Sequence, residues 1–382
     1  MARALFKGVA MSIKKTFSVL AVGLLAGTLV AGTGDVERTL VSTLTDISPT
    51  PVSVGSLAFG PENILFVGDT QGGAIYAMDL ADMAHGDGGA VELDGLDRKI
   101  ASMLGISVED LLIADMAVHP TSQTPYLSVM RGRGEGATPV LMRVSGDGTI
   151  QEVPFEGMRY SAMGLDNAPD PDQLYGRRGS ALTYSITDLA FVDGEVFVAG
   201  LSNEEFASNV RRLPFPFTGE HRSASLQIYH VSHGQNETHA PVMTFMVREI
   251  ESRTNILAAY TCTPLVQFSV ENLSDGEHVI GKTIAELGAG NQPLDMISYT
   301  ANGQERILIS NSRHPLMKIN PGLIPGATSL VDPTRETGIT FETTQELGVR
   351  QMDNLNDNYV LVLQQEGQNG PMNLRSLSKA SL

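Results

Sequence analysis

Residues 56–80 read SLAFGPENILFVGDTQGGAIYAMDL, and the order of residue types in this stretch decides the fold. An apolar segment is followed by a Gly-Pro turn, a second apolar segment, a polar Gly-rich loop and a third apolar segment. Short apolar runs separated by Gly, Pro, Asn and Asp are typical of antiparallel strands joined by tight turns. The stretch therefore predicts three consecutive strands of one sheet.

The same order of segments returns along the rest of the chain. Copies lie at 115–144, 188–231, 244–270, 295–319 and 352–377. Their first strands begin near 56, 115, 188, 244, 295 and 352, at intervals of 51 to 73 residues. Units of three or four strands at such a period predict an all-β, six-bladed β-propeller, with seven blades as the alternative.

The connecting segments complete this prediction. The segment after each third strand, such as 149–155, is expected to form a fourth, outer strand, and residues 37–47 to close the last blade. Two insertions break the period. Residues 97–113 predict a short helical insertion, with Ser107 and Asp110 placed as a capping box. Residues 156–184 are rich in Pro, Asp and Gly and predict an irregular loop.

The N-terminus has the layout of an export signal. Lys14 and Lys15 precede an apolar run from Phe17 to Val30, which small residues follow. This pattern predicts a signal peptide over residues 1–32 and a periplasmic or secreted protein with one propeller domain over 37–382. The alternative is an uncleaved anchor helix, although the run is shorter than the roughly 20 residues that span a bilayer.

The composition excludes several classes of protein. The 382 residues include 43 Asp and Glu against 26 Lys and Arg, which gives a formal charge of −17. Nucleic-acid binding depends on basic residues that neutralise phosphates, and an anionic membrane surface repels acidic proteins. The single cysteine excludes an intramolecular disulfide and a multi-thiolate metal site. The chain is therefore expected to bind a small molecule or a protein, without nucleic acid and without stable membrane insertion.

The candidate site follows from propeller geometry. Inner strands begin on the face that also carries the loops between second and third strands, so Asp115, Asp188 and Asp295 should gather at the mouth of the central channel. The same loops should contribute the ligand-binding residues Arg131, Asn203, Glu204, Asn311, Arg313 and His314. An alternative is that each Asp hydrogen-bonds backbone N–H groups between blades.

A long segment over residues 203–224 is expected to fold over the channel mouth as a lid. It carries Arg211, Arg212, Phe215 and Phe217, which would place a cationic and partly apolar surface above the acidic ring. Long loops in compact domains are often functional, and a packed flap is the alternative.

The unit at 57–76 resembles the repeats of NHL, SMP-30/gluconolactonase and TolB-like six-bladed propellers. SMP-30-like enzymes hold a divalent metal at the channel mouth, and the resemblance implies Ca²⁺ or Mg²⁺ on oxygen ligands. The corresponding metal ligands here would be Asp115, Asp188, Asn203 and Asp295. Ser56 departs from the pattern, which has Glu in the first blade. The expected function is therefore a binding or interaction module, and the alternative is a metal-dependent hydrolase or lactonase.

Two further groups of residues stand out. His230, His233, Glu237 and His239 form either a zinc or copper site or a hydrogen-bonded turn. Cys262 is either a buried structural thiol or a nucleophile with His314 as its base.

Overall fold

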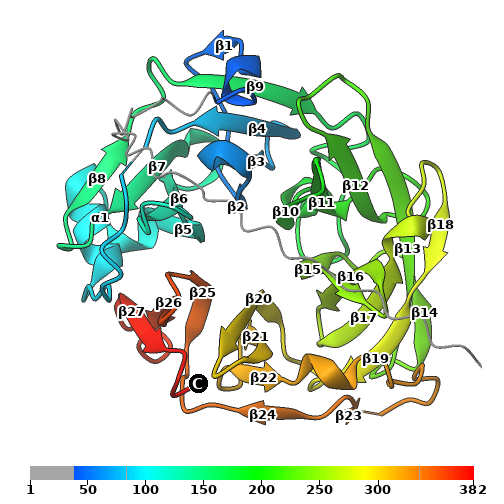
Figure 1. Cartoon of the computed structure of the whole chain (residues 1–382). Coiled ribbons are helices and arrows are strands. Elements are labelled where there is room, and N and C mark those ends of the chain that lie inside the picture. The colour runs from blue at the N-terminus through cyan, green and yellow to red at the C-terminus, as the bar shows by residue number, and fades with distance from the viewer. Residues whose placement is uncertain (1–37, 83, 335) are drawn as a thin grey trace, which may run out of the picture. The chain divides into compact units, whose positions relative to one another are not determined.

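The computed structural model describes residues 38–382 except 83 and 335, so the predicted signal peptide at 1–32 lies outside the described residues. The described part is built from antiparallel sheets that are arranged as the blades of a propeller (Figure 1). The prediction of an all-β, six-bladed propeller is confirmed. In this part of the chain, none of the helices has the length and apolar character to cross a membrane.

The blades are numbered by the order of their inner strands in the sequence. Blade 1 contains β2 (Leu57–Phe59), β3 (Ile64–Asp69), β4 (Ala74–Asp79), β9 (Arg159–Gly164) and β1 (Asp46–Ile47). Blade 2 contains β5 (Leu111–Val118), β6 (Pro125–Arg131), β7 (Thr138–Val144) and β8 (Ile150–Val153). Blade 3 contains β10 (Asp188–Val192), β11 (Glu195–Leu201), β12 (Ser208–Pro214) and β13 (Arg222–His230), and β13 also pairs with β14 (Gln235–Glu237) and β18 (His278–Ile280).

The remaining blades follow in sequence. Blade 4 contains β15 (Val242–Ile250), β16 (Arg253–Tyr260), β17 (Pro264–Ser269), β19 (Lys282–Glu286) and β23 (Thr337–Gly338). Blade 5 contains β20 (Pro293–Ala301), β21 (Gln304–Asn311), β22 (Met317–Ile319) and β24 (Phe341–Thr343). Blade 6 contains β25 (Val349–Asn354), β26 (Tyr359–Gln365) and β27 (Met372–Ser378).

The helical elements are short. The α-helix α1 covers Leu96–Leu104, and the 3₁₀ turns are Val41–Thr43, Pro61–Asn63, Val108–Asp110, Gly134–Gly136, Ala181–Tyr184, Val270–Asn272 and Pro321–Leu323. The predicted helical insertion at 97–113 is thus present only in its first part. The helix ends because Gly105 adopts a left-handed φ of 67°, and Ser107 then caps the next turn by accepting the Asp110 N–H at 3.3 Å.

Apolar clusters between facing sheets hold the blades together. The second strands are buried on both faces; all six residues of β3, for example, are buried. Phe66 of β3 packs with Val196 of blade 3, whereas its neighbour Leu65 packs with Tyr126 of blade 2. Successive side chains of a strand point to opposite faces, so one strand supplies two inter-blade cores.

The order of the blades around the ring differs from their order in the sequence. The inner strand β2 contacts β5 on one side and β10 on the other, and β5 also contacts β25. The ring order is therefore blade 2, 1, 3, 4, 5, 6 and back to blade 2 (Figure 1). After three strands of blade 1 the chain forms blade 2, then returns as β9 to pair with β4 before it enters blade 3. The strand β9 lies within the segment 156–184, where the sequence predicted only an irregular loop.

The position of blade 2 between blades 1 and 6 also decides how the ring is closed. The described part of the predicted closing segment 37–47, from Arg38 on, does not close the last blade, because β1 pairs with β9 at the outer edge of blade 1. Instead, Leu93 pairs with Leu374 of β27, and the Ser376 hydroxyl accepts the Val91 N–H at 2.7 Å. The link between blades 1 and 2 passes blade 6 because blade 2 is its neighbour in the ring, so this link supplies the outer edge of blade 6.

Candidate functional site: the central channel

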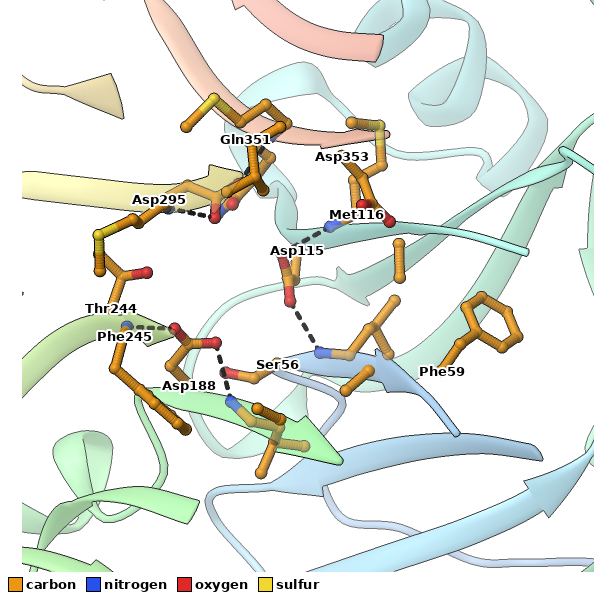
Figure 2. A pocket seen from close by; sticks show the side chains of 18 of the residues that line it. Ser56, Phe59, Asp115, Met116, Asp188, Thr244, Phe245, Asp295, Gln351 and Asp353 are labelled. Carbon is orange, nitrogen blue, oxygen red and sulfur yellow. Dashed lines mark hydrogen bonds between the residues drawn. The ribbon is translucent and has the colours of Figure 1, made fainter. Parts of the chain in front are cut away.

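The inner strands of all six blades line a central cavity of about 450 Å³ (Figure 2). Carboxylates from Asp115, Asp188, Asp295 and Asp353 face it. None of the described residues that line it is a lysine, arginine or histidine. The rest of the lining is mostly apolar and rich in methionine and phenylalanine. Asp115, Asp188 and Asp295, which the sequence predicted at the channel mouth, thus all line this cavity.

Asp115, Asp188 and Asp295 share one pattern of hydrogen bonds, which Asp353 also follows. One carboxylate oxygen accepts the N–H of the next residue in its own strand, and the other accepts an N–H from the inner strand of a neighbouring blade. The neighbouring donors are Leu57 to Asp115 at 2.7 Å, Phe245 to Asp188 at 2.8 Å and Met352 to Asp295 at 2.6 Å. Each aspartate therefore joins two blades, which is the alternative that the sequence left open for these residues.

Around the ring, the charged residues alternate with neutral ones. The corresponding positions, taken in ring order from blade 2, hold Asp115, Ser56, Asp188, Thr244, Asp295 and Gln351. In sequence order the aspartates fall unevenly, in blades 2, 3 and 5. Because blade 2 lies between blades 1 and 6, these three aspartates are evenly spaced in the ring, whereas the fourth carboxylate, Asp353 of blade 6, lies between Asp295 and Asp115 and its charge helps to raise the pKa of Asp115.

Asp353 is a channel residue that the sequence reasoning missed. It lies on β25, and its Oδ2 accepts the Val118 N–H of blade 2 at 2.7 Å. In this blade the acid follows the apolar residue Met352 instead of preceding an apolar residue. A search limited to Asp at strand entries does not find Asp353. The adjacent residues Met352 and Asp353 are the signal in the sequence by which it could have been found.

Burial and mutual repulsion make the carboxylates of the channel weak acids. Burial, followed by the charges of Asp188 and Asp353, raises the pKa of Asp115 to about 8, against the lowering effect of its N–H donors. Burial and the charges of Asp115 and Asp188 hold the pKa of Asp295 well above its ordinary value. Burial also raises the pKa of Asp188 and of Asp353 to about 6. Such a channel favours an added proton or cation.

The other predicted ligand-binding residues do not line this channel. Arg131 is exposed at the end of β6. Asn203 and Glu204 are exposed, and Glu204 accepts a hydrogen bond from the Asn167 amide at 3.1 Å. The structure does bring together Asn311, Arg313 and His314, around a separate cavity of about 580 Å³ that residues of blades 5 and 6 line.

The predicted lid over residues 203–224 is wrong, because this segment contains β12 and the start of β13. Arg211 is fully buried and donates to the Asn167 Oδ1 atom at 2.6 Å and to the Leu201 carbonyl at 2.9 Å. Arg212, on the opposite face of the strand, pairs with Glu195. The two consecutive arginines obscured the apolar pattern of β12 in the sequence. The strand accommodates both because each has hydrogen-bond or ion-pair partners within the protein.

Phe215 and Phe217 also belong to the core instead of a lid. The ring of Phe215 packs edge-to-face on Phe66 with centroids 5.0 Å apart, and on Phe217 at 5.2 Å. They therefore fill the space between blades 1 and 3.

The predicted metal ligands are not gathered into one coordination sphere. Asn203 lies outside the channel, and each of the three aspartates uses both oxygens to accept backbone N–H groups. Across residues 38–382, leaving aside 83 and 335, one group of His, Cys, Asp or Glu has ligand atoms within 4.8 Å of one another, and it consists of His230, His233 and Cys262.

Comparisons with known proteins give no family. No protein-family model matches the chain, and no curated protein matches it. Among solved structures, one described as an oxidoreductase (glucose dehydrogenase) from Thermus thermophilus is 14% identical, with a TM-score of 0.34 over 87% of this chain and 98% of that chain. The PQQ-bound aldose sugar dehydrogenase of Streptomyces coelicolor is 11% identical, with a TM-score of 0.32 over 87% and 95%.

A third solved structure is the extracellular domain of a hybrid two-component system from B. thetaiotaomicron. It is 10% identical, with a TM-score of 0.30, and the match covers 87% of this chain and 39% of that chain. Similarities this weak assign no activity to the chain, and the likeness to NHL, SMP-30 and TolB-like repeats stays a resemblance of the repeat unit.

Proposed function

We propose that the chain is exported and acts as a binding module whose central channel takes the cationic group of a ligand. One observation carries this proposal: four carboxylates and no basic side chain are among the described residues that line the cavity. Carboxylates that face a confined, partly apolar space are costly to ionise unless a cation accompanies them.

The apolar part of the lining narrows the class of ligand. Half-buried Met243 and Leu294 supply flexible aliphatic surface and Phe59 supplies aromatic surface, whereas Met116, Met296, Met352 and Phe245 are buried in the cores between blades. Such a lining suits an aliphatic stem, while the carboxylates suit an ammonium or guanidinium group. A cavity of about 450 Å³ is within the usual range for small-molecule sites. The ligand class is therefore a small organic amine or guanidine.

The test is calorimetric titration of the purified protein with straight-chain diamines and with agmatine, which bears a guanidinium group. A dicarboxylate of similar length is the control ligand. We expect the amines to bind and the dicarboxylate not to bind. Binding should strengthen as the pH rises from about 6 to about 8, because Asp188 and Asp115 ionise in that interval. Absence of amine binding at pH 8 would overturn the proposal.

Variants locate the binding in the channel. Asp188→Asn and Asp295→Asn should weaken amine binding about tenfold or more, since each removes one carboxylate from the cavity. Asp147→Asn makes the same chemical change at an exposed turn and should leave the affinity unchanged. Titrations are made well below the melting temperature of each variant, so that a loss of stability is not mistaken for a loss of binding.

The same titrations separate the amine-binding module from the metal-dependent hydrolase. If Ca²⁺ or Mg²⁺ binds in place of the amines, and Asp188→Asn and Asp295→Asn abolish that binding, the lactonase alternative is favoured. Assays with simple lactones in the presence of the bound cation would then test it directly.

A further inference from the structure

Two turns on neighbouring blades bring together three side chains that are typical metal ligands. His230 is the last residue of β13, His233 lies in the turn that follows, and Cys262 lies in the turn between β16 and β17. A ring nitrogen of each histidine and the Cys262 Sγ atom lie within 4.8 Å of one another. This group, here called the His-Cys cluster, lies apart from the residues that line the central channel.

From the sequence alone, the two histidines and Cys262 belonged to separate groups, for two reasons that the structure corrects. Two residues three apart on a strand point to opposite faces, yet β13 ends at His230 and the turn brings His233 back over it. The two imidazole rings stack with centroids 3.8 Å apart. In addition, β13 is the fourth strand of blade 3, because β12 precedes it. It therefore ends on the same face of the propeller as the turn that holds Cys262.

A carboxylate holds both histidines in one orientation. Glu237 Oε2 lies 2.6 Å from His230 Nδ1, and Glu237 Oε1 lies 2.7 Å from His233 Nδ1. A carboxylate accepts hydrogen bonds, so each histidine donates its Nδ1–H to Glu237, and in the neutral imidazoles both Nε2 atoms keep a lone pair for a metal ion. Metal-binding histidines usually have this kind of carboxylate partner.

An independent observation points to a missing partner in the cluster. The His230 side chain is 2% exposed, and its Nε2 atom has no hydrogen-bond partner among the described residues. A buried polar atom that lacks a partner costs free energy, so native proteins nearly always satisfy such atoms. His230 Nε2 faces this cost unless a further group, such as a metal ion, occupies the cluster.

A second buried carboxylate connects the two turns. Glu286 Oε2 accepts the Ser232 N–H at 3.3 Å, and Glu286 Oε1 accepts the Thr263 hydroxyl at 3.4 Å. Ser232 lies between the two histidines in the sequence, and Thr263 follows Cys262. Glu286 thereby fixes the turns of blades 3 and 4 relative to each other.

We propose that His230, His233 and Cys262 form a binding site for a transition-metal ion, with Glu237 orienting the two imidazoles. Imidazole and thiolate ligands select Zn²⁺ or copper over Ca²⁺ and Mg²⁺. Three protein ligands leave a fourth tetrahedral position open, and the 46% exposure of His233 gives the ion and a water molecule a path from solvent. The expected ion is Zn²⁺, with its fourth ligand supplied from outside the chain, and copper is the alternative ion.

The experiment is a titration of chelator-treated protein with Zn²⁺, Cu²⁺ and Co²⁺, with Ca²⁺ and Mg²⁺ as controls. We expect one equivalent of Zn²⁺ to bind and to raise the melting temperature, because a ligand that binds only the native state stabilises it. Co²⁺ should give a thiolate-to-metal charge-transfer band. Cu²⁺ binding that is tighter than Zn²⁺ binding would still support the site, because Cu²⁺ binds most nitrogen and sulfur ligands more tightly than Zn²⁺ does. Binding of Ca²⁺ in preference to Zn²⁺ would overturn the proposal.

Variants provide the second readout. Cys262→Ser should abolish the charge-transfer band, and Glu237→Gln should weaken Zn²⁺ binding about 10–100-fold because the histidines lose their orienting partner. His239→Gln is the matched control, since His239 is exposed nearby but lies outside the cluster. If buried His230→Gln fails to fold, exposed His233→Gln serves in its place. Unchanged Zn²⁺ binding in Cys262→Ser and His233→Gln would contradict the proposed site.

Discussion

Asp115 Oδ2 accepts the backbone N–H of Leu57 at 2.7 Å and thereby joins blade 2 to blade 1. The neighbour of blade 2 on its other side is blade 6, whose Asp353 Oδ2 accepts the Val118 N–H of blade 2 at 2.7 Å. Blade 2 is thus inserted between the first and the last blade of the chain. This exchange sets the spacing of the channel carboxylates, because it places a neutral residue between each pair of the three aspartates at strand entries.

The bond between Asp188 and Phe245 should contribute measurably to stability. Asp188→Ala leaves the N–H groups of Phe245 and Leu189 without their acceptor, so we expect the free energy of unfolding to fall by about 1–3 kcal/mol. Ser56→Ala removes a hydroxyl at the corresponding position of blade 1 and should change it by less than about 0.5 kcal/mol. Urea denaturation of both variants measures the difference, and equal effects would contradict an inter-blade role for Asp188.

The channel carboxylates should make stability fall as the pH rises. Asp has an ordinary pKa of 3.8, whereas folding raises that of Asp353 to about 6 and that of Asp115 to about 8. Between these values the native state binds more protons than the unfolded state, so its stability decreases with pH. The contribution is fully present below about pH 4 and is lost as the pH rises through 6 to 8.

Denaturant unfolding of wild type and Asp115→Asn across this pH range isolates the effect. The variant should show a flatter decline between about pH 6 and 8, since the group with the pKa of about 8 no longer titrates. Other groups, such as Glu286 with a pKa raised by burial to about 7, titrate in both proteins and cancel in the difference. Parallel profiles would show that Asp115 is not the group responsible.

Ring closure should depend on the contact between the blade 1–2 connection and β27. The Ser376 hydroxyl accepts the Val91 N–H at 2.7 Å and donates to the Val91 carbonyl at 2.9 Å. Ser376→Ala should therefore lower the free energy of unfolding by about 1–2 kcal/mol. Ser381→Ala, at an exposed hydroxyl in the C-terminal turn, should have almost no effect. A larger loss of stability in Ser381→Ala would contradict this closure.

Arg211 and Arg212 should differ sharply although they are adjacent. Arg211 is fully buried, and Arg211→Lys cannot reproduce its forked hydrogen bonds to Asn167, Ser185 and Leu201, so we expect a loss of about 3 kcal/mol or more. Arg212→Lys keeps a charge beside Glu195 at a partly exposed position and should cost about 1 kcal/mol or less. Thermal and urea unfolding of the two variants provide the measurement, and similar losses would be evidence against the buried hydrogen-bond network.

Local patterns predicted what depends on neighbours in the chain. The expected strand entries near 56, 115, 188, 244, 295 and 352 lie within a few residues of the observed starts at Leu57, Leu111, Asp188, Val242, Pro293 and Val349. Gly, Pro and Asp at turns, together with apolar runs between them, suffice for this because turn chemistry and hairpin pairing are local. The pattern failed where a strand carried charges that are satisfied inside the fold, as Arg211 shows in β12.

The sequence by itself therefore determined the all-β repeat, the presence of six units, and the orientation of Asp115, Asp188 and Asp295 toward one axis. Only the tertiary structure decided the order of the blades around that axis and the closure of the ring through Leu93 and Leu374. It also decided the meeting of His230 with Cys262. These features depend on which sheet faces pack against each other. Because every blade has similar apolar faces, the sequence carries almost no information about which blades become neighbours.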